Sequence, residues 1–163
     1  MTSRANRRRR WLGGLAAGSA WLVLRPAQAT PSTMQAAIQR FTGGATPRPG
    51  RVTLELPEIV ENGNTVPVTV SVDSPMTPGD HVRRLAVFNE KNPQPDVIEV
   101  WLGPRAGRAR VSLRMRMAES QTITAVAELS DGSVWQARAA VVVALAACLE
   151  GGADVPGRAP APG

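Results

Sequence analysis

The chain contains few of the residues on which enzymes and metalloproteins rely. Its 163 residues include one histidine, one cysteine and no tyrosine. One cysteine cannot close an internal disulfide, and the sequence has no Cys/His cluster with the spacing of a zinc site. It also lacks a G-x-S-x-G nucleophile elbow and a glycine-rich phosphate loop. We therefore predict no catalytic residue set, no metal ion and no cofactor.

The excess of positive charge is confined to the N-terminus. The formal net charge is +6, and six of the 19 basic residues lie in the first 29 positions, which contain no acidic residue. From Thr30 onward the chain has 13 basic and 13 acidic residues. Since the rest of the chain is formally neutral, its composition does not support a nucleic-acid partner.

The basic N-terminal segment has the three parts of an export signal. Residues 7–10 are all arginine, residues 11–24 are apolar, and residues 27–29 have the A-x-A cleavage pattern. The apolar run is shorter than the roughly 20 residues that span a bilayer. Paired arginines directly before it favour the twin-arginine route. We expect residues 1–29 to be a twin-arginine-type signal peptide and the mature protein to be periplasmic without a membrane contact. An uncleaved anchor is the alternative.

Export makes the single cysteine, Cys148, notable. A lone thiol in an oxidising compartment is a liability unless it is buried, paired between chains or used in the protein's function. Cys148 is therefore the first candidate functional residue.

The first segment after residue 29 has helical spacing. Ser32 and Thr33 are candidate N-caps, and Gly43 with Gly44 would end the helix. The apolar residues that share one face of this helix are Met34, Ala37, Ile38 and Phe41. Residues 45–50, with two prolines, are predicted to form a linker.

From residue 52 onward the apolar residues recur with a period of two. About seven strands are predicted, with turn residues between them. They cover residues 52–56, 66–72, 85–89, 97–102, 111–117, 123–129 and 134–145. This spacing is typical of an all-β protein, an immunoglobulin-like antiparallel β-sandwich, here with a short N-terminal helix. A small barrel is the alternative, because the Cys–Trp–Cys signature of true immunoglobulin domains is absent.

The strand over residues 66–72 is predicted to lie at an edge. Proline is tolerated on edge strands, and Pro67 stands within this one. No charged residue stands among its alternating valines, although such a residue would oppose pairing with another chain. We predict that this edge is exposed and pairs with a partner.

The strand over residues 111–117 has two distinct faces. Met115 and Met117 alternate with arginines, which favours core packing over binding of a soft metal. The opposite face carries Arg110, Arg114 and Arg116. These arginines could bind an anion or the acidic residues of a partner, although a solvated strand face is the simpler interpretation.

Five segments of the chain together carry a family resemblance. The first reads PEIVENG followed by VPVTV, and the next is NEKNPQP. They are followed by VSLRMRMA, SQTITAVA and DGSVW. In this order the segments resemble the SoxY family, the sulfur-carrier subunit of the periplasmic thiosulfate-oxidising Sox complex. The resemblance covers nearly the whole chain up to about residue 148.

This resemblance implies a function and a set of partners. It implies a periplasmic β-sandwich that forms a heterodimer with a SoxZ-like subunit. A C-terminal Gly-Gly-Cys-Gly-Gly arm would carry sulfur species covalently between enzymes. A haem-containing oxidase would couple thiosulfate to the thiol, and a hydrolase would release sulfate. The protein would thus be a carrier that serves as substrate for partner enzymes, with Cys148 as the sulfur-attachment residue.

The segment around Cys148 departs from the family pattern. Its neighbours are Ala146, Ala147, Leu149 and Glu150 instead of glycines. This arm is bulkier and stiffer than a glycine arm, and Glu150 disfavours the thiolate through its like charge. A diverged binding or regulatory protein that pairs with a SoxZ-like partner without carrying sulfur is therefore the alternative function.

We expect four segments in the chain. They are the signal peptide, a helix and linker over residues 30–50, the sandwich over residues 51–148, and a disordered tail over residues 149–163, which is rich in Gly, Pro and Ala.

Overall fold

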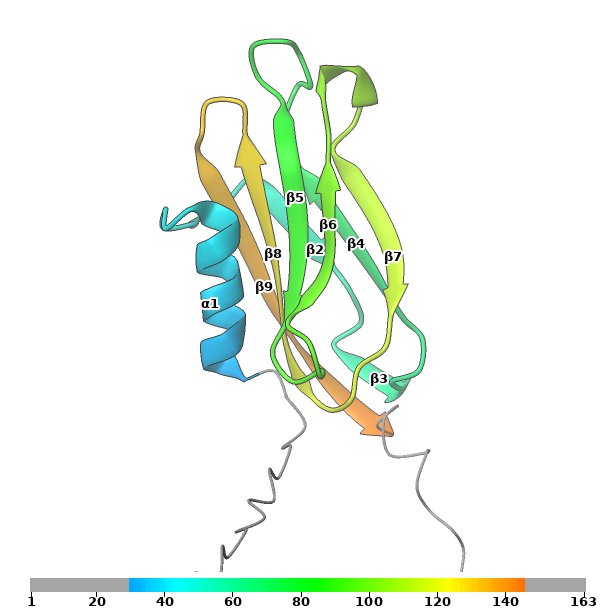
Figure 1. The fold of residues 1–163 in the computed structure, drawn as a ribbon. Helices are drawn as coiled ribbons and strands as arrows, with labels where there is room; N and C mark the ends of the chain where they lie inside the picture. Colours follow the sequence, from blue (N-terminus) through cyan, green and yellow to red (C-terminus); the bar gives the residue numbers. More distant parts are fainter. Residues whose placement is uncertain (1–29, 146–163) are drawn as a thin grey trace, which may run out of the picture.

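Two β-sheets pack face to face in the computed structural model, which describes residues 30–145 (Figure 1). The larger sheet has the order β1-β9-β8-β5-β6, with β3 also paired to β9, and the smaller has the order β2-β4-β7. The strands of the larger sheet are β1 (Arg48–Pro49), β3 (Ile59–Asn62), β5 (Val82–Asn89), β6 (Asp96–Trp101), β8 (Gln121–Leu129) and β9 (Val134–Leu145). Those of the smaller are β2 (Val52–Glu55), β4 (Val66–Val72) and β7 (Arg110–Met115). The predicted immunoglobulin-like β-sandwich is confirmed.

The main core lies between the two sheets. Alternate side chains of the longer strands point into it, and the four valines of β4 are between 0% and 7% exposed. Met115 and Met117 are 6% and 0% exposed, which confirms the prediction that they pack in the core. Burying one such side chain contributes about 1.5–3 kcal/mol, so this double layer supplies most of the stability of the fold.

The prediction that residues 66–72 form an exposed edge is wrong. β4 is the middle strand of the smaller sheet, between β2 and β7. Its pairing with β2 ends at Thr69, whereas its pairing with β7 continues to Val66. At Pro67 the strand therefore has a neighbour on one side only, which is the setting in which a sheet tolerates proline. The proline marks the end of one pairing partner and not an edge strand.

The one α-helix within residues 30–145, α1 (Pro31–Thr42), covers part of the outer face of the larger sheet (Figure 1). Its N-cap is Thr30, whose side chain accepts a hydrogen bond from the Thr33 backbone amide at 3.2 Å, with Pro31 following as the first helical residue. Gly43 ends the helix in the left-handed conformation, at φ 62°. The predicted apolar face is buried against the sheet in a second cluster of Met34, Ala37, Ile38, Phe41, Ala86, Phe88, Val126 and Val134.

The predicted linker over residues 45–50 contains a short strand. β1 pairs in parallel with the start of β9, where Arg48 lies opposite Trp135. The Arg48 guanidinium stacks over the Trp135 ring at 4.4 Å. Gly50, at φ 111°, follows directly, and a Cβ there would approach that ring to 3.3 Å. The aromatic contact and the two backbone pairs therefore hold this segment against the sheet.

A short 3-10 turn, η1 (Pro104–Ala106), connects β6 to β7. No helix in residues 30–145 is long and apolar enough to cross a membrane.

Candidate functional site at the end of β9

The last strand of the sandwich ends three residues before the candidate attachment residue. β9 is described as far as Leu145, so Cys148 lies outside the described residues, as do the predicted signal peptide and tail. The described part of the site is the end of β9, after which the Cys148 segment follows in the sequence. In Figure 1 the orange end of β9 lies at the lower end of the sandwich, beside β3.

At this end β9 extends beyond β8, its main neighbour. Its pairing with β8 stops at the Gln121–Val141 pair. Beyond that point β9 pairs in parallel with β3, from Ile59 opposite Val142 to Asn62 opposite Leu145. On the side of β9 opposite β8, this parallel pairing supplies partners for the backbone of the extension, whereas β8 no longer does so on its own side.

Two further hydrogen bonds hold this extension. The Val142 amide donates to the Glu58 carbonyl at 2.8 Å. The Val143 amide donates to the Ser120 hydroxyl oxygen at 2.9 Å. One bond comes from each side of the strand, so the chain is fixed immediately before the segment that carries the thiol.

β3 was not predicted from the sequence. It has only four residues, and its pattern of exposure does not alternate clearly. The local sequence signal is limited to the apolar pair Ile59 and Val60 within PEIVENG, one of the segments that resemble the SoxY family. Its place depends on a parallel pairing with a strand far along the chain, which no local pattern reveals.

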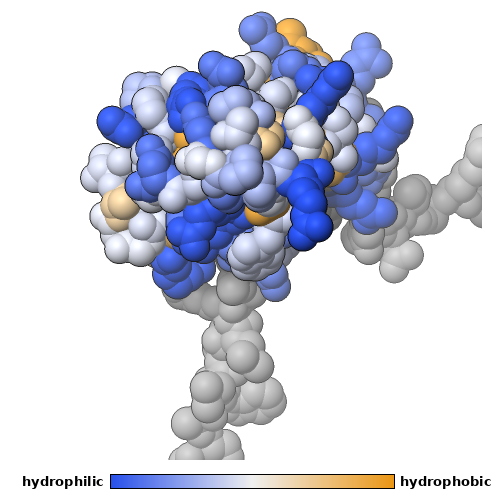
Figure 2. Space-filling view, turned by 90° about the horizontal axis from the view of Figure 1, so that it is seen from above, coloured by the Kyte–Doolittle hydropathy of each residue, from blue (hydrophilic) through white to orange (hydrophobic). Residues whose placement is uncertain are grey.

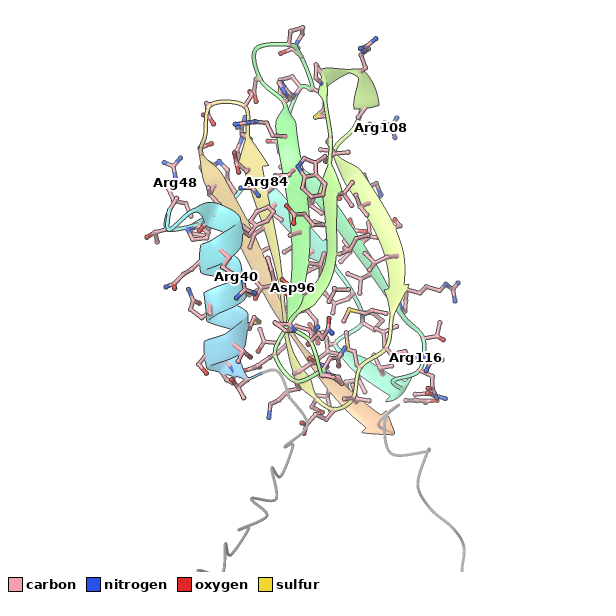
Figure 3. All side chains as sticks on the ribbon, in the orientation of Figure 1. Arg40, Arg48, Arg84, Asp96, Arg108 and Arg116 are labelled. Carbon is pink, nitrogen blue, oxygen red and sulfur yellow. The ribbon has the colours of Figure 1, made fainter. Side chains whose placement is uncertain are left out.

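The arginines on the exposed face of β7 differ in whether they form ion pairs. Arg110 pairs with Glu55 on β2 at 3.2 Å and donates to the Ser71 hydroxyl at 3.3 Å. Arg114 and Arg116 are exposed and form no ion pair within residues 30–145. These two line a groove of about 660 Å³ between the edge strands β6 and β7. Figure 3 places Arg116 at the lower end of the sandwich, and the next residue, Met117, donates its amide to Gly63 directly after β3.

A second groove, of about 470 Å³, runs between α1 and β6. Its most buried charged side chain, Arg84, is fully engaged. Arg84 donates to Glu128 at 2.7 Å through Nε, to Glu99 at 3.3 Å, and to the Phe41 carbonyl at 2.5 Å. Its guanidinium also stacks over the Phe41 ring at 4.3 Å. Arg84 thus fastens the end of the helix to the sheet and has little capacity left for a ligand.

The single histidine takes part in a turn. His81 Nδ1 lies 3.1 Å from the Thr77 carbonyl oxygen. Within the described part of the chain, no three His, Cys, Asp or Glu side chains are grouped so that they could hold a metal ion.

The fold and this site together define a class: an immunoglobulin-like β-sandwich whose final strand presents the C-terminal segment at one end. The family model of the sulfur oxidation protein SoxY matches residues 38–148. The structure of the sulfur carrier protein SoxY from Chlorobium limicola f thiosulfatophilum is 32% identical, with a TM-score of 0.57 over 69% of this chain and 96% of that one. The chain belongs to the SoxY family, as its sequence segments predicted.

A more distant likeness shows the fold alone. A superoxide reductase (neelaredoxin) from Ignicoccus hospitalis is 20% identical, with a TM-score of 0.52 over 58% of this chain and 80% of that one. No curated protein matches the chain. Membership of the SoxY family implies a sulfur-carrier role in Sox thiosulfate oxidation, and proteins of this family generally pair with SoxZ and are typically periplasmic.

Proposed function

We propose that this chain is a periplasmic carrier that holds sulfur intermediates of thiosulfate oxidation covalently on Cys148. The observation that carries the proposal is the family match, which extends to residue 148 and therefore includes the only cysteine of the chain. The anchored end of β9 supports it, because the thiol follows that end by three residues. A thiol presented beyond a fixed root is suited to visit the active sites of other proteins.

The chemistry is that of a nucleophilic thiolate. In the first step the Cys148 thiolate and the outer sulfur of thiosulfate form an S–S bond, and two electrons pass to a haem-containing oxidase. In the second step water attacks the terminal sulfonate sulfur in a hydrolase. Sulfate and two protons leave, and a persulfide anion remains on Cys148. The carrier chain itself supplies the attachment atom and no catalytic group.

The residues beside Cys148 set the efficiency of these transfers. Glycine neighbours would leave the backbone free to thread a narrow channel, whereas Ala147 and Leu149 add side chains and restrict it. Partner enzymes must therefore have a wider entrance than a glycine arm needs, or accept this carrier more slowly.

Export and pairing complete the proposal. The N-terminal segment directs the chain through the twin-arginine route, and the mature chain begins near Thr30. It forms a heterodimer with a SoxZ-like subunit. N-terminal sequencing of the periplasmic protein tests the first point, and co-purification with the SoxZ-like protein tests the second.

Intact-mass analysis of the protein purified from the periplasm tests the carrier role. After exposure to thiosulfate we expect adducts in sulfur-sized or thiosulfate-sized increments. They should be lost on reduction and absent from a Cys148→Ala variant. A Cys148 that stays unmodified, and reacts with an alkylating agent only after denaturation, would contradict carriage. It would favour the second function, a SoxZ-binding subunit without cargo, for which the missing glycines are the supporting observation.

A further inference from the structure

Two exposed aliphatic side chains lie together at the root of the Cys148 segment. Among residues 30–145, the exposed large hydrophobic residues are Ile59 (71% exposed), Trp101 (69%) and Val142 (54%). Ile59 and Val142 are direct partners in the β3–β9 pairing, so they share one face of the sheet. The next pair along, Val60 and Val143, points the other way and packs against the main core. We call the exposed pair of Ile59 and Val142 the root patch.

The position of the root patch ties it to the thiol. The chain from Leu145 to Cys148 has three residues, which span about 11 Å at full extension. Any enzyme that forms or breaks a bond to the Cys148 sulfur must bring its active-site entrance within that distance of Leu145. Leu145 lies in the same β3–β9 pairing as the root patch. Such an enzyme therefore reaches the surface on which Ile59 and Val142 are exposed.

The charge beside the root patch indicates the chemistry of the partner surface. Glu61 lies two residues after Ile59 on the same face of β3, and Glu58 directly precedes Ile59. Both are exposed, and neither forms an ion pair with another described residue. Arg138, the exposed cation on the same face of β9, lies four residues before Val142, about 13 Å away along the strand, and is therefore farther from the patch than Glu61 is. Arg116 follows β7 of the smaller sheet, from which the root patch faces away. An apolar spot with acidic neighbours fits an apolar surface bordered by lysine or arginine.

Among the described residues, the opposite end of the sandwich carries no second pair of exposed large aliphatic side chains. Figure 2, which views that end, shows mainly hydrophilic side chains with small, separate apolar spots. The third exposed hydrophobic residue, Trp101, is distant from the root patch. Trp101 pairs with Arg84, Arg84 with Glu128, and Glu128 with Val134, so Trp101 lies level with Val134 across the sheet. Val134 is eight residues before Val142 on β9, which places Trp101 about 26 Å from the root patch along the strand direction.

From this arrangement we propose that the root patch is the docking surface for the enzymes that load and unload Cys148. It binds an apolar, basic-bordered surface beside their active-site entrance and so holds the thiol segment at the channel. This inference rests on the proposed carrier function. It adds the residues by which a partner enzyme recognises the body of the carrier apart from its cysteine.

The test compares variants of the full mature chain in complex with its SoxZ-like partner. Ile59→Thr and Val142→Thr, combined, remove the apolar groups but keep β-branched residues that suit a strand. Trp101→Thr is the matched control, because it removes a side chain of equal exposure at the other end. The assay follows sulfur loading of Cys148 by intact mass, with thiosulfate and the haem-containing oxidase. A small alkylating agent measures the intrinsic reactivity of the thiol.

We expect kcat/KM for loading to fall roughly tenfold in the root-patch variant, mostly through KM, and to stay within about twofold in the control. The alkylation rate should be unchanged in both. Glu58→Gln with Glu61→Gln should also weaken the dependence of kcat/KM on salt.

Three results would overturn the proposal. Equal loading of wild type and root-patch variant would refute the docking surface and leave the carrier function standing. Loss of the SoxZ-like subunit from the root-patch variant would assign the surface to the heterodimer. Absence of any sulfur on wild-type Cys148 would refute the carrier function and this inference with it.

Discussion

Arg84 is predicted to be the residue on which attachment of the helix to the sandwich most depends. Its side chain is 28% exposed, and its guanidinium reaches Glu128, Glu99 and the carbonyl of Phe41 at the end of α1. Glu128 is only 15% exposed, so an Arg84→Ala variant leaves a mostly buried carboxylate with the more exposed Arg83 as its remaining partner at 3.2 Å. The variant also removes the stacking of the guanidinium on the Phe41 ring.

The exposed fractions of these side chains set the expected loss of unfolding free energy in the Arg84→Ala variant. Breaking a fully buried ion pair costs about 3–5 kcal/mol, and an exposed pair is worth about 0–1 kcal/mol. Arg84 lies between these limits and Glu128 retains Arg83, so we expect Arg84→Ala to lower the free energy of unfolding by about 2 kcal/mol. Arg84→Lys keeps the charge but loses the forked geometry, and should cost about 1 kcal/mol.

Urea denaturation followed by tryptophan fluorescence measures this difference. The control is Arg40→Ala. Arg40 lies on α1 and pairs with Asp96 of β6 at 3.7 Å, and both side chains are more than half exposed. That pair should contribute less than about 0.5 kcal/mol. If Arg84→Ala were no more destabilising than Arg40→Ala, the account of how the helix is held would be refuted.

Two further predictions concern the arm and a turn. Replacing Ala147 and Leu149 with glycine should raise the rate at which partner enzymes load Cys148 and leave the free energy of unfolding unchanged; an unchanged loading rate would show that side-chain bulk does not limit entry. In the turn between β8 and β9, hydrogen bonds from the Ser133 hydroxyl and amide lower the pKa of Asp131 below its usual 3.8. The stability from this interaction is present above that pH and is lost as the pH falls through the lowered pKa. Carbon-13 NMR titration should show that Ser133→Ala raises the Asp131 pKa, and the same pKa in both proteins would contradict this cause.

The strands of this protein can be predicted from the local sequence pattern, but which strands pair with one another cannot. Alternating apolar residues identify the inward face of β4 because side chains on a strand point to opposite sides with a period of two. The same alternation occurs in central and edge strands. Pro67 therefore predicts an edge, although β4 has a neighbour on both sides from Thr69 onward.

The candidate site likewise has some features that follow from the sequence and others that follow only from the tertiary structure. The sequence by itself determined the family, the single thiol and its place after the final strand, since these depend on residue identity and order along the chain. It also determined the helix face, because helical spacing is local. Only the tertiary structure decided that β3 pairs with the end of β9 and that Ile59 and Val142 become neighbours on an exposed face. Their contact requires a parallel pairing between segments far apart in the chain, and the free energy of such a pairing depends on the whole assembled sheet.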